Sequence, residues 1–179
     1  MRALVEAKGL DAVAVQKLAT LSAPPAQLRS IGLEIEYTDA PLLEHKAIAA
    51  VLSLPGLRTL SVEVRWEDVT AAQVAALCVA AGAHVEELSL IGITLGKGAL
   101  FAAALAAKPH ALRTLSWGYT SGTTATARCT SGGWNRVELV SDRAPGTEWE
   151  RHVRELVRGL PAGLAIESAD PAVAKIVAG

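Results

Sequence analysis

The stretch Leu57–Trp66, LRTLSVEVRW, decides the fold that this sequence predicts. Its residues Leu60, Val62 and Val64 alternate with polar ones, which is the period of a β-strand with one buried and one open face. The same spacing, Leu-x-x-Leu-x-Leu or a close variant, recurs with its middle residue at 31, 60, 88 and 115, and more weakly at 137 and 164. A near-constant period of this size indicates a solenoid, in which each unit buries its apolar face against its neighbours.

Helical patterns lie between the strands. A capping box, Thr70-x-x-Gln73, opens one of them, and an apolar stripe follows it over residues 74–81. Strands that alternate with helices are expected to be parallel and joined by right-handed crossovers. Because each strand alternates, one face of the sheet must stay in water, so the helices are expected on the other face only. The predicted fold class is therefore α/β, a right-handed β-α solenoid with a parallel sheet and helices on one side.

The chain of 179 residues is long enough for one domain with a core of its own, so residues 1–179 are expected to form a single domain. Residues 1–27 are interpreted as an N-terminal cap, with a first strand near residues 2–6, and residues 168–179 as a C-terminal cap. The pattern lapses at 119–132, which is rich in Gly, Ser and Thr and has no apolar helical stripe. That composition predicts an irregular, mobile surface loop.

The repeated box over about residues 28–117 resembles the leucine-rich-repeat family, and its period is similar to that of the ribonuclease-inhibitor-like class. The resemblance is looser over 134–167. It implies an interaction module without catalytic residues, which binds a protein partner on its open strand face. The family usually has Asn or Cys three residues after the last apolar position of the box. In this chain those positions are Glu36, Arg65, Ile93 and Thr120.

Composition narrows the class of partner and the compartment. The formal net charge is -1, so no basic excess points to nucleic acid, and no apolar run approaches the ~20 residues of a membrane span. Glu6 and Lys8 stand where a signal peptide needs its apolar region. Cys78 lies on the apolar side of a predicted helix and Cys129 in the predicted loop, so no disulfide is expected between them. A cytoplasmic protein is expected.

The open strand face is the candidate binding surface. Its middle column of small side chains would leave a shallow groove that could admit another chain, although small residues would also suit the curvature of the sheet. From one end of the strands to the other, the three expected columns are Ser30, Thr59, Glu87, Thr114 and Arg136; Gly32, Ser61, Ser89, Ser116 and Glu138; and Glu34, Glu63, Ile91, Gly118 and Val140.

A protein partner of unknown identity is expected to bind this face. Ile91 is the predicted apolar anchor, and the charged residues would set the choice of partner. The expected protein-binding residues are Glu34, Arg58, Glu63, Arg65, Glu87 and Ile91.

Catalysis is not expected. Glu34 and Glu63 would lie roughly 5 Å apart on neighbouring strands, but an open face gives little of the burial that splits the pKa values of a catalytic pair. The four histidines have no ligand spacing and no Gly-rich phosphate loop follows a strand, so neither a metal nor a cofactor is expected. Two alternatives stay open: a small parallel α/β enzyme or nucleotide-binding domain with no recognisable motif, and a structural protein that self-associates through a sheet edge.

Overall fold

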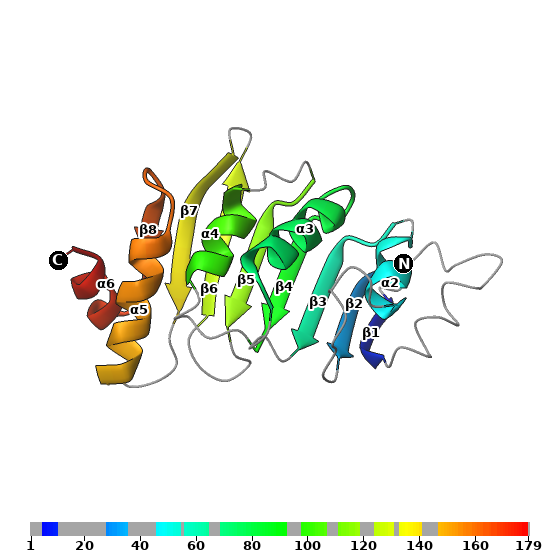
Figure 1. Cartoon of the computed structure of the whole chain (residues 1–179), viewed down its shortest axis with the longest axis horizontal. Coiled ribbons are helices and arrows are strands. Elements are labelled where there is room, and N and C mark those ends of the chain that lie inside the picture. Colours follow the sequence, from blue (N-terminus) through cyan, green and yellow to red (C-terminus); the bar gives the residue numbers. More distant parts are fainter. Residues whose placement is uncertain are drawn as a thin grey trace.

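The structure is a computed structural model, and it describes residues 5–10, 28–35, 46–54, 56–64, 69–92, 98–106, 111–118, 124–130, 133–140 and 147–178. In these ranges the strands form one open sheet whose order, β1 to β8, is the order of the chain (Figure 1). The strands are β1 (Val5–Leu10), β2 (Leu28–Ile35), β3 (Thr59–Val64), β4 (Glu87–Ile91), β5 (Thr114–Gly118), β6 (Thr124–Thr130), β7 (Gly133–Val140) and β8 (Ala165–Glu167). The helices are α2 (Lys46–Leu52), α3 (Ala71–Ala81), α4 (Gly98–Ala106), α5 (Thr147–Gly159) and α6 (Pro171–Ala178).

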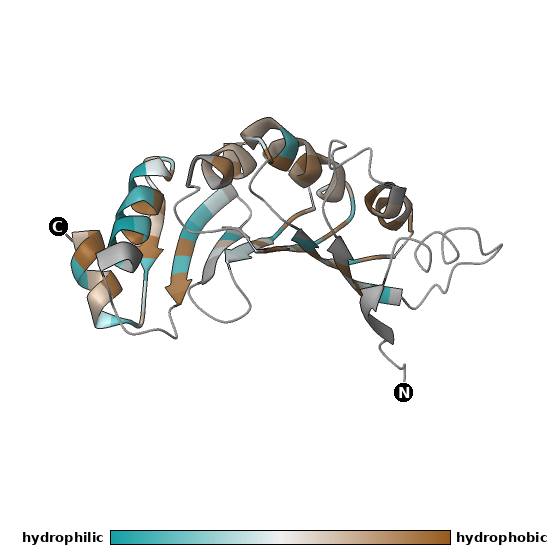
Figure 2. Ribbon diagram, turned by 60° about the horizontal axis from the view of Figure 1, so that its bottom comes forward, coloured by the Kyte–Doolittle hydropathy of each residue, from teal (hydrophilic) through white to brown (hydrophobic). Residues whose placement is uncertain are grey.

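The sheet is mostly parallel, and the helices α2 to α5 lie along one side of it. Strands β1 to β5 run parallel to their neighbours, as do β7 and β8. Figure 2 shows a bowed sheet with the helices on its convex side. Helices are wider than the strand spacing of about 4.8 Å, so a helix layer on one side curves the sheet away from it. The predicted α/β class is confirmed, but the sheet is mostly parallel and not parallel throughout as predicted.

The prediction of an irregular loop over 119–132 is wrong for residues 124–130, which form β6. This strand pairs antiparallel with both β5 and β7, so the sheet is not parallel throughout. The strand follows from a period-2 pattern in which Thr124, Thr126 and Arg128 alternate with small residues such as Ala127, which is fully buried. Alanine gives a weak apolar signal, which explains why the pattern reads as a loop. Residues 119–123 and 131–132 lie outside the described ranges.

The two antiparallel steps restore the original strand direction, so β7 runs the same way as β5. Arg128 pairs with Thr114 on one side and with Arg136 on the other. Arg136 therefore keeps the column that the repeat predicts for it, although one more strand separates it from Thr114. The predicted columns place Arg136 directly beside Thr114, which is wrong because β6 lies between their strands. The assignment of residues to columns is correct.

The core is an aliphatic layer between the sheet and the helices. Side chains that the alternation directs inward are almost fully buried: Leu60, Val62, Leu88, Leu90 and Leu115 are at most 2% exposed. Their burial confirms the predicted inner face of the strands. The buried residues of the helices, among them Val74, Leu77 and Val153, belong to the same cluster. One continuous core therefore holds the sheet from its convex side.

Local hydrogen bonds fix the ends of the repeated units. Thr70 caps α3 as predicted: its Oγ1 accepts from the Gln73 backbone N–H at 3.3 Å, and Gln73 Oε1 accepts from the Thr70 N–H at 2.8 Å. A backbone ladder joins Arg29, near the start of β2, to the residues just before β3 and β4: Arg58 N donates to Arg29 O at 2.8 Å, and Glu86 N donates to Arg58 O at 2.8 Å. The units of β2, β3 and β4 are thus already joined to one another where β3 and β4 begin.

Candidate functional site

The open face of the sheet, meaning the concave side that α2 to α5 leave uncovered, is the candidate site. Its middle column forms what we call the trough: the half-buried hydroxyl side chains Ser61, Ser89, Ser116 and Thr126, which are in register on four adjacent strands. Side chains of the outer columns stand about 6.6 Å to either side, two residues along each strand. The predicted small-residue column therefore exists, and β6 lengthens it by Thr126.

Two carboxylates flank the trough on opposite sides. Glu63 of β3 belongs to the third column and Glu87 of β4 to the first, and both are exposed. Glu87 Oε2 accepts from Thr59 Oγ1 at 3.4 Å. Among the residues that the structure describes, neither carboxylate forms an ion pair. This part of the face therefore carries negative charge that no described cation neutralises.

The other predicted binding residues fare differently. The backbone of Glu34 pairs with that of Glu63 as expected, but the Glu34 side chain and the whole of Arg65 lie outside what the structure describes. Arg58 is held at the turn before β4: its Nη1 donates to the His84 carbonyl oxygen at 2.9 Å, and its Nε lies 3.5 Å from Glu86 Oε1. Its guanidinium is thus engaged with the turn that precedes β4.

Among the described residues of this face, Val140 is an exposed large apolar side chain, whereas Ile91, the predicted anchor, is half-buried. Ile91 is half-buried in the third column, next to Glu63. Val140 lies in the same column at the end of β7, and 50% of it is exposed. The sequence assigned Val140 to this column, but apolar character alone does not tell how far a side chain stands out from its neighbours.

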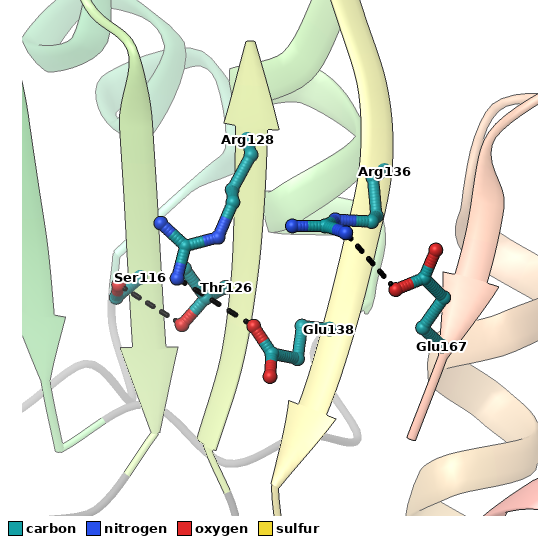
Figure 3. Close-up of polar contacts among 6 residues, drawn as sticks. All are labelled: Ser116, Thr126, Arg128, Arg136, Glu138 and Glu167. Atoms are coloured by element: carbon teal, nitrogen blue, oxygen red, sulfur yellow. Dashed lines mark hydrogen bonds and ion pairs between the residues drawn. The ribbon is translucent and has the colours of Figure 1, made fainter. Parts of the chain in front are cut away.

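Over β6, β7 and β8, charged side chains of the open face pair with one another, as Figure 3 shows, and we call this part the neutralised half. Arg128 Nη2 lies 3.5 Å from Glu138 Oε2, and Arg136 Nη1 donates to Glu167 Oε2 at 3.1 Å. Arg128 was hidden from sequence reasoning because it falls in the stretch interpreted as a loop. The signal that could have found it is the alternation of Thr and Arg with Ala over 124–128.

A pocket of about 570 Å³ lies beyond this half, between β8 and α6. Its apolar wall comes from α6, with Ala174 and Val177, and its polar wall includes Ser168. Ser168 Oγ donates to the Leu139 carbonyl oxygen at 2.7 Å, which ties the start of α6 to β7. In Figure 3 the carboxylates of Glu138 and Glu167, which also line the pocket, turn towards their arginines.

Cys78 is a free cysteine buried in α3. Burial raises the pKa of the Cys78 thiol from 9.0 to about 12, so the thiol stays protonated and a poor nucleophile at neutral pH. Within the described ranges, no group of three or more His, Cys, Asp or Glu side chains could hold a metal ion, and no helix could cross a membrane. No protein-family model matches this chain, and no curated protein matches it.

Proposed function

We propose that this chain is a non-enzymatic, leucine-rich-repeat-like interaction module that recognises a protein partner on its open face. The trough is the observation that carries this proposal. Hydroxyl side chains are in register on β3, β4, β5 and β6, and the larger side chains of Glu63, Ile91 and Glu87 flank them over β3 and β4. From Ser61 to Thr126 the trough crosses three strand spacings, about 14 Å, which is the length of about four residues of extended chain.

The support behind the trough favours tight recognition. Inward side chains of the same strands, such as Leu60, Leu88 and Leu115, are at most 1% exposed and pack into the core. A surface fixed in this way loses little conformational entropy when a partner binds. The open face is therefore suited to hold a segment of another protein without rearrangement.

The polar composition of the face favours selectivity. Hydroxyl groups both donate and accept hydrogen bonds, so the trough can pair with the backbone of a bound segment. Glu63 and Glu87, which lack ion pairs among the described residues, would favour partners with complementary charge and steer their approach. Val140 adds an exposed apolar contact near the far end of the face.

A bulky side chain in the trough tests the proposal. Ser89→Trp fills the middle of the trough, whereas Ala76→Trp puts the same bulk on an exposed position of α3, on the opposite side of the molecule. Partners captured by the wild-type protein and identified by mass spectrometry should bind Ser89→Trp at least tenfold more weakly, about 1.4 kcal/mol, and bind Ala76→Trp normally. If Ala76→Trp abolishes capture and Ser89→Trp does not, the binding surface is the helix layer.

A further inference from the structure

The charges on the open face divide it into two halves. Over β6, β7 and β8, Glu138 and Glu167 each have an arginine within 3.5 Å. Over β3 and β4, Glu63 and Glu87 are exposed and form no ion pair with any residue that the structure describes. A bound partner can therefore gain charge pairing over β3 and β4, whereas over β6 to β8 it would have to displace existing pairs.

The trough ends on β6, which is also the first strand of the neutralised half. Its column continues from Thr126 to Glu138 on β7 and Glu167 on β8. These long side chains are held by Arg128 and Arg136, as Figure 3 shows, and they replace the short hydroxyl groups of the trough. On this side a chain lying in the trough is thus stopped at β7, whereas on the other side the column continues to Gly32 of β2.

The positions of Glu63 and Glu87 define what such a chain must carry. The two carboxylates project on opposite sides of the trough, and they are displaced along it by one strand spacing, about 4.8 Å. In an extended segment, consecutive side chains also point to opposite sides, displaced by about 3.3 Å. Long, flexible lysine or arginine side chains can absorb the difference. Residues two apart would both point to the same side and could not reach both carboxylates.

The backbone of the same segment would meet the hydroxyl groups. When alternate side chains point sideways towards the outer columns, the N–H and C=O groups point down into the trough and up to solvent. Ser61, Ser89 and Ser116 each present a hydroxyl there, which can serve either group as acceptor or donor. Alanine in place of these serines would be equally small, but it would give the backbone of the bound segment no hydrogen-bond partner.

We propose that the open face binds an extended segment of its partner that carries two consecutive basic residues, Lys or Arg, placed between Glu63 and Glu87. This inference rests on the proposed function for the use of the open face, and it adds the chemistry of the partner. One basic side chain pairs with Glu63 in the third column, on one side of the trough, and the next pairs with Glu87 in the first column, on the other side. The flanking residues lie over Ser116 and Thr126 and must be small.

Labelled hexapeptides test the proposal with the full chain, by fluorescence anisotropy. The first has two adjacent arginines among Gly and Ser residues, the second has the same composition with one Ser between the arginines, and the third has glutamates in place of arginines. The adjacent pair should bind at least fivefold more tightly than the spaced pair, and its affinity should fall as salt is added. The acidic peptide should not bind.

Charge-removing variants locate the site. Glu63→Gln and Glu87→Gln together should weaken binding of the adjacent-arginine peptide at least tenfold. Glu155→Gln, which removes the carboxylate of an exposed ion pair on α5, is the matched control and should leave binding unchanged. Equal binding of the spaced peptide, normal binding by the double variant, or no measurable binding of any basic peptide would each overturn the inference.

Failure of this inference can be distinguished from failure of the proposed function. Loss of partner capture in Ser89→Trp, together with unchanged peptide binding in the double Gln variant, means that the open face is used but that charge does not select the partner. Normal partner capture in Ser89→Trp means that the proposed function itself is wrong.

Discussion

Ser116 and Thr126 face each other across the antiparallel pair of β5 and β6, with 3.2 Å between Ser116 Oγ and Thr126 Oγ1. The contact joins the last strand of the parallel series to the strand that reverses direction. It also continues the trough without a step in height, because both side chains are short. The trough thus continues across a change of strand direction that the repeat pattern does not predict.

Strand β6 should be among the protected parts of the sheet. Its residues 124–130 pair with β5 on one side and β7 on the other, and Ala127 is fully buried. Amide hydrogens in a central strand exchange only when the sheet opens. Hydrogen exchange followed by mass spectrometry should show protection over 124–130 comparable to that of β4. Rapid tryptic cleavage after Arg128 in the native protein would contradict this.

Truncation of Leu88 to alanine should destabilise the protein severely. Leu88 is 1% exposed and lies in the middle of the core, in register with Leu60 and Leu115. The Leu88→Ala change removes packed methyl groups and leaves a cavity, which costs about 2–5 kcal/mol. Urea denaturation measures the loss. Glu87→Ala changes the exposed neighbour on the same strand and should stay within about 0.5 kcal/mol of the wild type.

Loss of the cap on α3 should cost less but remain measurable. Thr70→Ala removes the oxygen that accepts from Gln73 N–H, which should reduce the free energy of unfolding by about 0.5–2 kcal/mol. Thr70→Ser keeps a hydroxyl at the same position, so it should retain most of that stability. A Thr70→Ser protein as unstable as Thr70→Ala would mean that the methyl group, and not the cap, is responsible.

The Cys78 thiol should make stability fall at alkaline pH. Its pKa is about 12 in the folded protein and 9.0 for an unperturbed thiol, because burial disfavours the thiolate. A folded pKa raised in this way contributes stability that is fully present below pH 9 and is lost as the pH rises towards 12, since the unfolded chain ionises first. Urea denaturation of the wild type between these pH values should show a steeper decline than that of Cys78→Ala. Parallel declines would mean that other groups cause the loss.

The alternation of apolar and polar residues was enough to determine which strand residues face the core. The repeated spacing also determined the register, because equivalent positions of stacked units pair with one another. Leu60 lies beside Leu88 and Ser61 beside Ser89, as the period requires. The open face and its small-residue column were therefore readable from the chain alone. These features are local, because a strand of period 2 presents the same face wherever it packs.

Tertiary structure alone decided the role of 124–130 and the engagement of individual polar side chains. A short strand of Thr, Ala and Arg has too little apolar surface to be predicted from its sequence. It is stabilised by hydrogen bonds from β5 and β7, its neighbours in the chain, and its own pattern does not show that these strands flank it. The same holds for Arg58, whose guanidinium is drawn to the His84 carbonyl oxygen by a turn 26 residues away. Hydrogen bonds and ion pairs depend on which groups meet in space, and that depends on how the strands pack and not on the residue types alone.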